Sequence, residues 1–327
     1  MAVTGTLAAL RPGATTIDAV MTRIGFIGLG AMGAPMAGNL LRAGHQVSVH
    51  ARRPAAMSPL VALGARACGS AAEAAAASDI VFTMVTDTAA VEAVTLGPGG
   101  ILEGMAPGGL VVDHSTIAPD ASRRIAAALG ARGISMLDAP VSGGVIGAEA
   151  GTLVVMVGGP ADALARCQPL LSANASRVIH MGPAGSGQVA KACNQMCIVV
   201  NQLGVAEALL VAERSGLDPA RLIEALQGGF AASRVLELQG PKMAARAFEG
   251  RIESRLHHKD IQIALELASS LGVQVHASAL AAGVLARLQE QGGATLDSAA
   301  VLTIVESGSQ TQSSNLPPSP QPLTSDL

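Results

Sequence analysis

Residues 23–33 read RIGFIGLGAMG, and this stretch decides the fold that the sequence predicts. Its apolar first half is typical of a buried strand, and a GxGxxG pattern follows at 28–33. We expect a helix over 32–43, so that strand, loop and helix open a βαβ unit. In such a unit the glycines allow a tight turn and a close approach of the backbone to a pyrophosphate, which the helix N-terminus favours electrostatically. The predicted cofactor contacts in this loop are Gly28, Leu29, Gly30, Ala31, Met32 and Gly33.

Further apolar runs predict the rest of the first domain. They alternate with Ala-rich stretches of helical character and cover 23–28, 46–50, 79–84, 110–113, 134–138, 153–158 and 177–181. Continuous apolar strands that alternate with helices indicate parallel strands buried on both faces. The sequence therefore predicts an α/β fold in which residues 22–185 form a Rossmann-type doubly wound sheet.

The strand signal disappears after residue 186. A long helix is predicted to begin there and to end at Gly216, and further helices are expected around 257–271 and 276–291. We therefore expect an all-α C-terminal domain over 186–306, joined to the first domain by the long helix. Residues 1–21 are expected to be a disordered extension, with Met21 as an alternative start. The Ser-, Pro- and Gln-rich end, 307–327, is expected to be a disordered tail.

Composition argues against several classes of protein. The 327 residues are 50% hydrophobic, 14% charged and 1% aromatic, with a formal net charge of -3. Few stacking rings and the lack of a basic excess argue against nucleic-acid binding. The most apolar run, 196–212, contains Asn201, Gln202 and Glu207, which predicts a buried helix and no membrane span.

The cysteines are Cys68, Cys167, Cys193 and Cys197, and they form no CxxC pair. In a chain of this size they are expected to be free thiols in a reducing compartment, which favours a cytoplasmic location. Cys193 and Cys197 share a helix face but have no second ligand pair nearby in the sequence. No metal site is therefore predicted.

The stretch VHARRP at 49–54 places Arg52 and Arg53 at the end of the second predicted strand. An NAD site usually carries an acid there, about 20 residues after the glycine loop, for the adenosine ribose hydroxyls. This chain has no Asp or Glu from 19 to 72. Two forked cations favour a 2′-phosphate, so NADP(H) is the predicted cofactor and NAD(H) the alternative. The competing interpretation is that both arginines are ordinary solvated charge.

Four ordered motifs resemble those of the β-hydroxyacid dehydrogenases, the family that includes 3-hydroxyisobutyrate dehydrogenase and tartronate semialdehyde reductase. They are GFIGLGAMGAPMAGNLLRAG (25–44), DAPVSGGVIGAEAGTLVVMVGG (138–159), GSGQVAKACNQ (185–195) and HHKD (257–260). The resemblance covers about 22–306 and leaves both tails outside. It implies an NAD(P)-dependent oxidoreductase that acts on a small carboxylate-bearing substrate.

Lys191 lies in the apolar helical context VAKACNQMCIVV, where a buried ammonium needs partners. Asn194 and Gln195 follow at i+3 and i+4 on the same helix face, and we expect them to hold the ammonium and the substrate oxygens. The resemblance makes Lys191 the catalytic general acid, which protonates the developing alkoxide during reduction.

Two further segments are expected to face the substrate cleft. Ser142, Gly143 and Gly144 place a hydroxyl beside consecutive backbone N–H groups, which suits a carboxylate. Family members use this segment to bind substrate. By resemblance Lys259 reaches across the cleft to the cofactor, while His257 is expected to cap a helix or line the cleft.

The ends of two central strands supply the remaining expected cofactor contacts. Met84 and Val85 end one strand, where the family more often has Leu-Pro. Ser115 and Thr116 follow the next strand, at the edge where ligands of open α/β folds collect. The family places a serine or threonine there near the nicotinamide ribose and the substrate.

Two details favour one substrate branch. The catalytic helix reads CNQ where hydroxyisobutyrate dehydrogenases usually read NN at the last two places, and 222–243 resembles the reductase pattern. Reduction of tartronate semialdehyde (2-hydroxy-3-oxopropionate) to glycerate is therefore favoured. The alternatives are a 3-hydroxyisobutyrate dehydrogenase, a threonate-type dehydrogenase, and, outside the enzyme class, a non-catalytic NADP(H)-binding sensor. The apolar helices of the second domain predict a homodimer or homotetramer.

Overall fold

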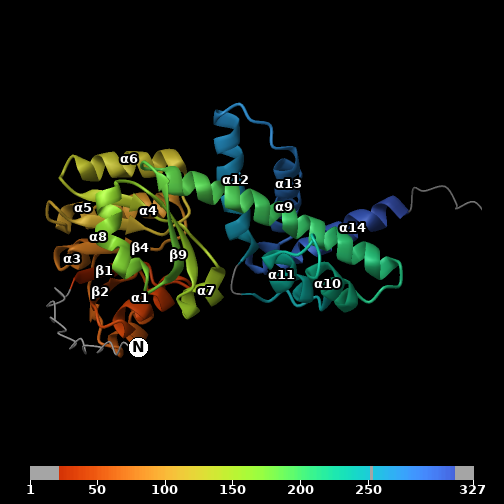
Figure 1. The fold of residues 1–327 in the computed structure, drawn as a ribbon, viewed down its shortest axis with the longest axis horizontal. Coiled ribbons are helices and arrows are strands. Elements are labelled where there is room, and N and C mark those ends of the chain that lie inside the picture. Colours follow the sequence, from red (N-terminus) through yellow and green to blue (C-terminus); the bar gives the residue numbers. More distant parts are fainter. Residues whose placement is uncertain (1–21, 251–252, 314–327) are drawn as a thin grey trace, which may run out of the picture.

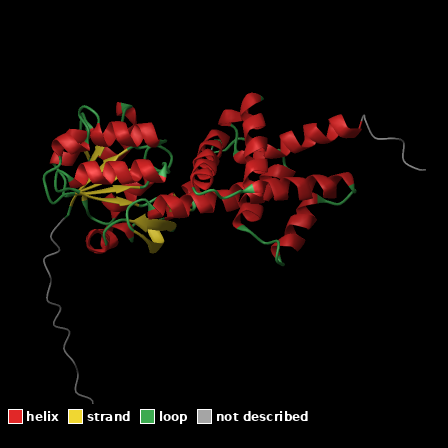
Figure 2. Cartoon of the chain, turned by 90° about the horizontal axis from the view of Figure 1, so that it is seen from above, coloured by secondary structure: helices red, strands yellow, loops and turns green. Residues whose placement is uncertain are grey.

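The chain forms two lobes joined by one long helix (Figure 1). The structure is a computed structural model that describes residues 22–250 and 253–313. The predicted extension at 1–21 and the part of the predicted tail beyond Ser313 lie outside the described residues. Strands are confined to one lobe and the other is built from helices (Figure 2), as the sequence predicts.

The first lobe contains every strand of the described residues. They are β1 (Arg23–Ile27), β2 (Gln46–His50), β3 (Arg66–Ala67), β4 (Ile80–Thr83), β5 (Leu110–Asp113), β6 (Ser135–Asp138), β7 (Val141–Ser142), β8 (Leu153–Gly158) and β9 (Ala175–Gly182). Between them run α1 (Gly33–Arg42), α2 (Ser58–Val61), α3 (Ala71–Ala76), α4 (Thr88–Leu96), α5 (Ile101–Gly104), α6 (Pro119–Gly130), α7 (Gly144–Ala150), α8 (Ala161–Leu171) and the 3-10 helix Pro54–Ala56.

The strands form one sheet in the order β3-β2-β1-β4-β5-β6-β8-β7, with β9 paired to β8. The pairs from β3 to β6 are parallel, which is the expected Rossmann-type arrangement. The expectation that every strand runs parallel is wrong, because β8 is antiparallel to β6 and β7. Between β6 and β8 the chain has only the two-residue β7 and the seven-residue α7. The chain therefore doubles back on itself and makes no full crossover.

Both faces of the sheet are buried, as continuous apolar strands require. Phe26, Phe82 and Val112 contribute to the core on one face, while Ile27 and Val81 contribute to the core on the other. Phe26 and Phe82 stack with ring centroids 6.0 Å apart. The parallel strands therefore end at one well-ordered edge, to which the candidate site residues attach.

The second lobe packs around α9 (Ser186–Arg214). It comprises α10 (Pro219–Gln227), α11 (Arg234–Ala244), α12 (Ser254–Ser270), α13 (His276–Glu290), α14 (Val301–Ser313) and the 3-10 helices Gly293–Thr295 and Ser298–Ala300. The predicted helix at 257–271 begins earlier, at Ser254, and α14 extends into the range that was expected to be tail from residue 307. By length and composition α9 would cross a bilayer, but half of its most apolar window is buried in the described lobes, as in a core helix.

Candidate active site

The glycine loop between β1 and α1 has the geometry that its sequence predicts. Gly28 has a φ of +95°, and a Cβ added to it would collide with the carbonyl oxygen of Met84. A Cβ on Gly33 would collide with the carbonyl oxygen of Gly28, so α1 can start this close to β1 only with glycine there. By contrast, a Cβ on Gly30 would meet nothing within 4 Å, so its outer side is open to a ligand.

The N–H groups of this loop fit a pyrophosphate. Within the described part of the chain, the N–H groups of Gly30, Ala31 and Met32 donate to no protein acceptor. They stand at the start of the ten-residue α1, whose dipole favours negative charge. The residues present therefore fit a dinucleotide, which 28–33 would hold by its phosphates.

Arg52 and Arg53 follow β2 at the same edge of the sheet, and both are exposed. Neither guanidinium has a hydrogen-bond or ion-pair partner among residues 22–250 and 253–313. The preceding His50 is fixed by a contact of its Nδ1 with the carbonyl oxygen of Cys68 at 3.0 Å. Two unpaired cations therefore lie at the end of β2, which is the position next to the adenosine ribose of a dinucleotide in a fold of this kind.

The ends of β4 and β5 are joined by a buried hydrogen-bond network. The Thr83 hydroxyl donates to Asp113 Oδ1 at 2.7 Å, and the Ser115 N–H donates to the same oxygen at 3.0 Å. The Val85 N–H donates to the Ser115 hydroxyl at 2.9 Å. Met84 and Val85 follow β4, which ends one residue earlier than the predicted strand. Val85, which lies against Gly28, is therefore tied to the end of β5 through Ser115.

Burial shifts two ionisable groups at the end of β5 in opposite directions. It raises the pKa of Asp113 to about 6, partly offset by the hydrogen bonds that its carboxylate accepts. It lowers the pKa of His114 to about 4, while the contact of Nδ1 with the Ala139 carbonyl raises it. The His114 ring also stacks on Phe82, with centroids 5.5 Å apart. His114 is therefore neutral at physiological pH.

The Lys191 side chain projects from α9 toward β7, in the same sheet. Its ammonium donates to the Val141 carbonyl oxygen at 2.9 Å, and its side chain is buried. Burial lowers the pKa of Lys191, Asp260 raises it, and Lys259 lowers it. The ammonium therefore lies directly beside 142–144 and is a stronger acid than a solvated lysine.

The 142–144 segment has a backbone that requires glycine. Gly143 and Gly144 have φ values of +131° and +62°. A Cβ on Gly143 would lie 3.1 Å from Leu153 Cδ2, so the segment packs tightly on β8. Ser142 closes β7, and Gly144 begins α7. The structure thus brings the predicted carboxylate-binding segment and the predicted proton donor together.

The expectation that Asn194 and Gln195 hold the Lys191 ammonium is wrong. Asn194 Nδ2 donates to Gln195 Oε1 at 2.9 Å, and Gln195 Nε2 donates to Asp260 Oδ2 at 2.5 Å. Both ends of the Gln195 amide are therefore engaged within the helical lobe. The ammonium instead uses a backbone carbonyl, because the side chain leaves α9 toward β7.

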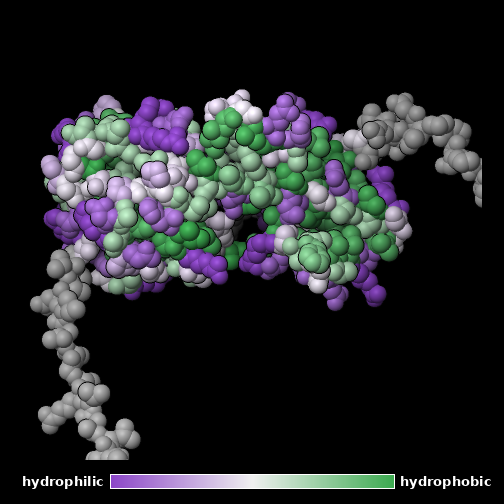
Figure 3. All heavy atoms as spheres, turned by 45° about the horizontal axis from the view of Figure 1, so that its top comes forward, coloured by the Kyte–Doolittle hydropathy of each residue, from purple (hydrophilic) through white to green (hydrophobic). Residues whose placement is uncertain are grey.

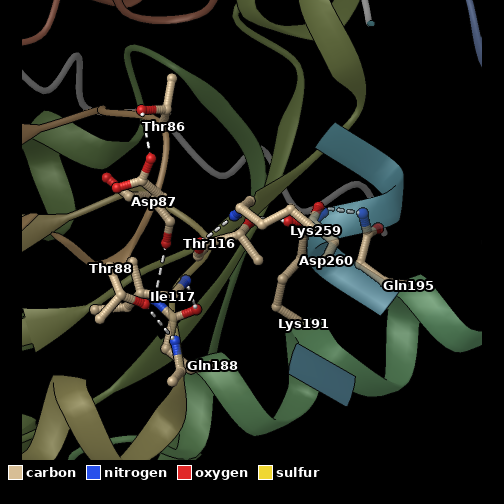
Figure 4. Close-up of polar contacts among 12 residues, drawn as sticks. Thr86, Asp87, Thr88, Thr116, Ile117, Gln188, Lys191, Gln195, Lys259 and Asp260 are labelled. Atoms are coloured by element: carbon tan, nitrogen blue, oxygen red, sulfur yellow. Dashed lines mark hydrogen bonds and ion pairs between the residues drawn. The ribbon is translucent and has the colours of Figure 1, made fainter. Parts of the chain in front are cut away.

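Lys259 crosses from α12 to the sheet edge at which Thr116 lies (Figure 4). Its ammonium donates to the Thr116 carbonyl oxygen at 2.5 Å and pairs with Asp260 Oδ1 at 2.8 Å. Lys191, Lys259 and the turn after β5 thus meet where the two lobes adjoin, and the surface is hollowed between the lobes (Figure 3).

Comparison with known proteins decides the family. Residues 23–182 match the family described as the NAD binding domain of 6-phosphogluconate dehydrogenase, and 185–305 match that described as NAD-binding of NADP-dependent 3-hydroxyisobutyrate dehydrogenase. Over 284 residues the chain is 41% identical to 2-hydroxy-3-oxopropionate reductase of Escherichia coli (strain K12), covering 87% of this chain and 97% of that one. The chain belongs to the β-hydroxyacid dehydrogenase family.

Other β-hydroxyacid dehydrogenases that resemble this chain differ in their named substrates. An NAD-dependent L-serine dehydrogenase of Pseudomonas aeruginosa is 41% identical over 284 residues, covering 85% of this chain and 95% of the relative. The solved structure of Mycobacterium tuberculosis 3-hydroxyisobutyrate dehydrogenase with L-serine has 36% identity and a TM-score of 0.80, covering 87% of this chain and 99% of that one. The family makes this protein an NAD(P)-dependent oxidoreductase acting on CH–OH groups.

The helical lobe contributes His257, whose pKa is affected by burial and by the charges of Asp260 and Lys191. His257, which was expected to cap a helix or line the cleft, is buried with its Nδ1 against Gln202 and the Ser298 hydroxyl inside the helical lobe. Burial lowers the pKa of His257. In the described ranges 22–250 and 253–313, no group of three or more His, Cys, Asp or Glu is arranged for a metal.

Sequence reasoning missed four buried residues that organise this site. Asp113 anchors the turn after β5, and Asp138 accepts from the Gly185 and Gln188 N–H groups at the start of α9, at 2.7 and 3.0 Å. Gln188 contacts the turn after β5, and Asp260 lies between Gln195 and Lys259. Asp138, Gln188 and Asp260 lie within motifs that carry the family resemblance, whereas Asp113 lies outside them at the end of an apolar run. A polar residue in a buried stretch was the available signal for all four.

Proposed function

We propose that this β-hydroxyacid dehydrogenase is an NADPH-preferring reductase of tartronate semialdehyde (2-hydroxy-3-oxopropionate), with glycerate as product. The buried Lys191 ammonium beside 142–144 carries the proposal, because it sets a proton donor against a segment suited to a carboxylate. The relative named 2-hydroxy-3-oxopropionate reductase, at 41% identity, supports the choice of substrate.

In the proposed reaction one group of residues binds the substrate carboxylate and Lys191 donates the proton. Ser142 and the N–H groups of Gly143 and Gly144 bind the substrate carboxylate, which orients the aldehyde. Lys191 donates a hydrogen bond to the carbonyl oxygen and then a proton as negative charge develops there. Asn194 borders the substrate beside Lys191. Bound NADPH supplies the hydride.

The cofactor is proposed to lie along the sheet edge. The 28–33 loop would hold the pyrophosphate, and Arg52 and Arg53 the 2′-phosphate, with NAD(H) as the weaker alternative. Met84, Val85, Ser115 and Thr116 would border the nicotinamide half, and Lys259 would approach it from the helical lobe. The unpaired state of both guanidiniums supports this preference for NADPH.

Rival substrates are separated by one panel of assays. Initial rates would be measured with tartronate semialdehyde, methylmalonate semialdehyde, threonate and L-serine, each with the phosphorylated and unphosphorylated cofactor. We expect the highest kcat/KM for tartronate semialdehyde with NADPH. A higher value for methylmalonate semialdehyde, threonate or L-serine would assign the corresponding dehydrogenase activity instead, and a higher value with NADH would refute the cofactor preference.

Lys191→Ala separates an enzyme from a sensor. In the variant we expect kcat to fall by about 10²–10⁴-fold, the usual contribution of a positioned acid, with cofactor binding retained. Turnover near the wild-type rate would refute the role of Lys191. Cofactor binding without turnover by the wild type across the panel would support a non-catalytic NADP(H)-binding sensor.

We also propose that the protein is a cytoplasmic homodimer or homotetramer. Large apolar side chains are exposed on the helical lobe, among them Val211 and Leu280, each 66% exposed. Such positions on a helical surface favour association. Sedimentation velocity would give the mass of the assembly, and cell fractionation its compartment; a monomer or a membrane-bound pool would contradict this proposal.

A further inference from the structure

The turn at 115–117 is held from several elements at once. The Ser115 hydroxyl accepts from the Val85 N–H at 2.9 Å, and the Thr116 carbonyl accepts from Lys259 at 2.5 Å. Two further backbone groups of the turn, the Ser115 carbonyl and the Ile117 N–H, are both paired with Gln188. The turn therefore has its place set by β4, by the helical lobe and by α9 together.

Gln188 makes these two contacts with opposite ends of one amide. Its Nε2 donates to the Ser115 carbonyl at 2.8 Å. Its Oε1 accepts from the Ile117 N–H at 3.1 Å (Figure 4). The side chain is only 1% exposed, so water cannot replace either contact. Only a side chain with both a donor and an acceptor satisfies the two backbone groups.

The backbone of Gln188 is fixed as firmly as its side chain. Its N–H donates to Asp138 Oδ2 at 3.0 Å, in the first turn of α9. Lys191 lies three residues further along the same helix, on the same face. One rigid helical turn therefore sets the distance between the turn at 115–117 and the Lys191 ammonium.

We propose that Gln188 is a positioning residue of the reaction, whose amide holds the 115–117 turn in register with Lys191. The inference rests on the proposed function, since it matters for catalysis only if Lys191 is the proton donor and the turn borders the cofactor. This amide fixes the position of the 115–117 turn, next to the proposed cofactor site, relative to Lys191. A shift of about 1 Å between such groups is enough to slow a reaction by about a hundredfold.

Two variants of Gln188 test the amide. Gln188→Leu removes both hydrogen bonds and leaves the Ser115 carbonyl and the Ile117 N–H buried without partners. Gln188→Glu keeps the acceptor for Ile117 but, when ionised, sets an oxygen against the Ser115 carbonyl. We expect kcat/KM for the semialdehyde to fall by about tenfold to a hundredfold in both variants, with a raised KM for NADPH.

The pH profile distinguishes positioning from loss of fold. A protonated glutamic acid can donate to the Ser115 carbonyl, so the deficit of Gln188→Glu relative to wild type should shrink as the pH falls. Gln188→Leu has no such group, so its deficit should not change with pH. A Gln188→Glu deficit that stays constant with pH would refute the proposed role of the amide.

Gln202 supplies a matched control on the same helix. It is also a buried glutamine, 0% exposed, but its Nε2 contacts His257 inside the helical lobe. Gln202→Leu should lower Tm while leaving kcat/KM and the cofactor KM within about twofold of wild type. Rates are compared at a temperature where circular dichroism shows every variant folded.

The remaining outcomes separate this inference from the proposed function. If Lys191→Ala loses turnover but both Gln188 variants keep wild-type kcat/KM, only the positioning role fails. Equal kinetic losses in the Gln188 and Gln202 variants would reduce the role to general stability and overturn the inference. If Lys191→Ala retains turnover, the proposed function fails, whatever the Gln188 variants do.

Discussion

At the scale of single residues, the Lys191 ammonium experiences opposed influences. Burial is the largest and lowers its pKa, the Asp260 carboxylate raises it, and the Lys259 ammonium lowers it. A general acid works best when its pKa lies near the working pH. Asp260 therefore keeps a partly desolvated lysine protonated while burial makes it a better proton donor than a solvated lysine.

Asp260→Asn should move the pH profile of reduction. In the proposed mechanism reduction needs protonated Lys191, so its rate is lost as the pH rises through the lysine pKa. Removing the negative charge removes an influence that raises this pKa, so the alkaline limb of kcat/KM should shift to lower pH. Asp297→Asn is the control, because Asp297 is a buried acid paired with Lys242 and is no cause of the Lys191 shift. A limb that moves to higher pH, or equally in both variants, would contradict the coupling.

Arg52 and Arg53 should determine the choice of cofactor. Both are exposed and lack protein partners in the described residues, so replacing them should leave the fold intact. Each charge-assisted hydrogen bond to a 2′-phosphate contributes about 1.5–3 kcal/mol. Arg53→Ala should therefore raise the KM for NADPH by about ten- to a hundredfold with little change for NADH, and Arg52→Asp should do so more strongly. Equal rises in the KM for NADPH and for NADH would show that neither arginine binds the 2′-phosphate.

At the scale of elements, two glycines of the β1–α1 connection have different roles: Gly33 allows close packing, and Gly30 leaves space for a ligand. Gly33→Ala forces a Cβ against the Gly28 carbonyl and should cost about 1–3 kcal/mol of unfolding free energy. Gly30→Ala meets open space, so its stability should stay within about 0.5 kcal/mol of wild type. Its cofactor affinity should nevertheless fall by at least about tenfold, because the methyl occupies the pyrophosphate side. Denaturant titration and cofactor titration of both variants would check the pair, and a Gly30→Ala variant with normal affinity would place the phosphates elsewhere.

Asp113 and His114, at the end of β5, should make the free energy of unfolding depend on pH. The pKa of Asp113 rises on folding from about 3.9 to about 6, so its contribution is present at low pH and lost as the pH rises through this window. The pKa of His114 falls from about 6.5 to about 4, so its contribution is present near neutral pH and lost as the pH falls. The two slopes therefore oppose each other between about pH 4 and 6.

Replacing one of the two residues should reveal how the other makes the free energy of unfolding change with pH. In Asp113→Asn the His114 contribution is no longer opposed by Asp113, so stability should fall toward acid more steeply than in wild type, by about 1.4 kcal/mol per pH unit. In His114→Asn only the Asp113 contribution remains, so the slope relative to wild type should have the opposite sign. Denaturant midpoints at several pH values between 4.5 and 6.5 would give both slopes. Slopes of the same sign would mean that the two groups do not titrate as their burial requires.

The sequence predicted most elements because apolar runs in a chain this poor in charge are strong signals. It missed β3 and β7, which are two residues long and carry no periodic pattern. It also missed the reversed direction of β8, because strand direction depends on how the connection folds, which the strand's own residues do not specify.

Within the candidate site, the sequence identified Lys191 and the segments around it but not their partners. The Lys191 ammonium meets a backbone carbonyl 50 residues away, Gln188 meets one 73 residues away, and Lys259 meets one 143 residues away. Backbone carbonyls have no residue identity that a sequence pattern can show. The helical spacing of Asn194 and Gln195 gave the correct face but the wrong partner, since Asp260 from another helix takes the amide.

At the scale of the whole molecule, α9 belongs to both lobes. Gly187 and Gln188 at its start lie against Asp138 of the sheet, whereas Ala192 and Val199 belong to the core of the helical lobe. Lys191 stands where the helix passes from one lobe to the other. A ligand that stabilises the first lobe therefore acts on the helix that carries the proposed proton donor.

The native cysteines differ in exposure between the two lobes, so their reaction rates can be used to follow opening of the first lobe. Cys193 and Cys197 are exposed on α9, while Cys68 and Cys167 are buried in the first lobe. Burial also raises the pKa of Cys167 to about 12, so little reactive thiolate forms in the folded state. A thiol reagent such as DTNB should therefore react in a fast phase with the α9 pair and in a slow phase that requires opening of the first lobe.

NADPH should slow only the slow phase. A ligand that binds the folded lobe at about 100 times its Kd stabilises it by about 2.7 kcal/mol, which lowers the open population by about a hundredfold. The slow phase should lengthen by up to that factor, while the fast phase keeps its rate because α9 already exposes both thiols. Cys193→Ser with Cys197→Ser should remove the fast phase and leave the slow one, which assigns the phases. A slow phase insensitive to NADPH would mean that the buried thiols react through motions that leave the cofactor site closed.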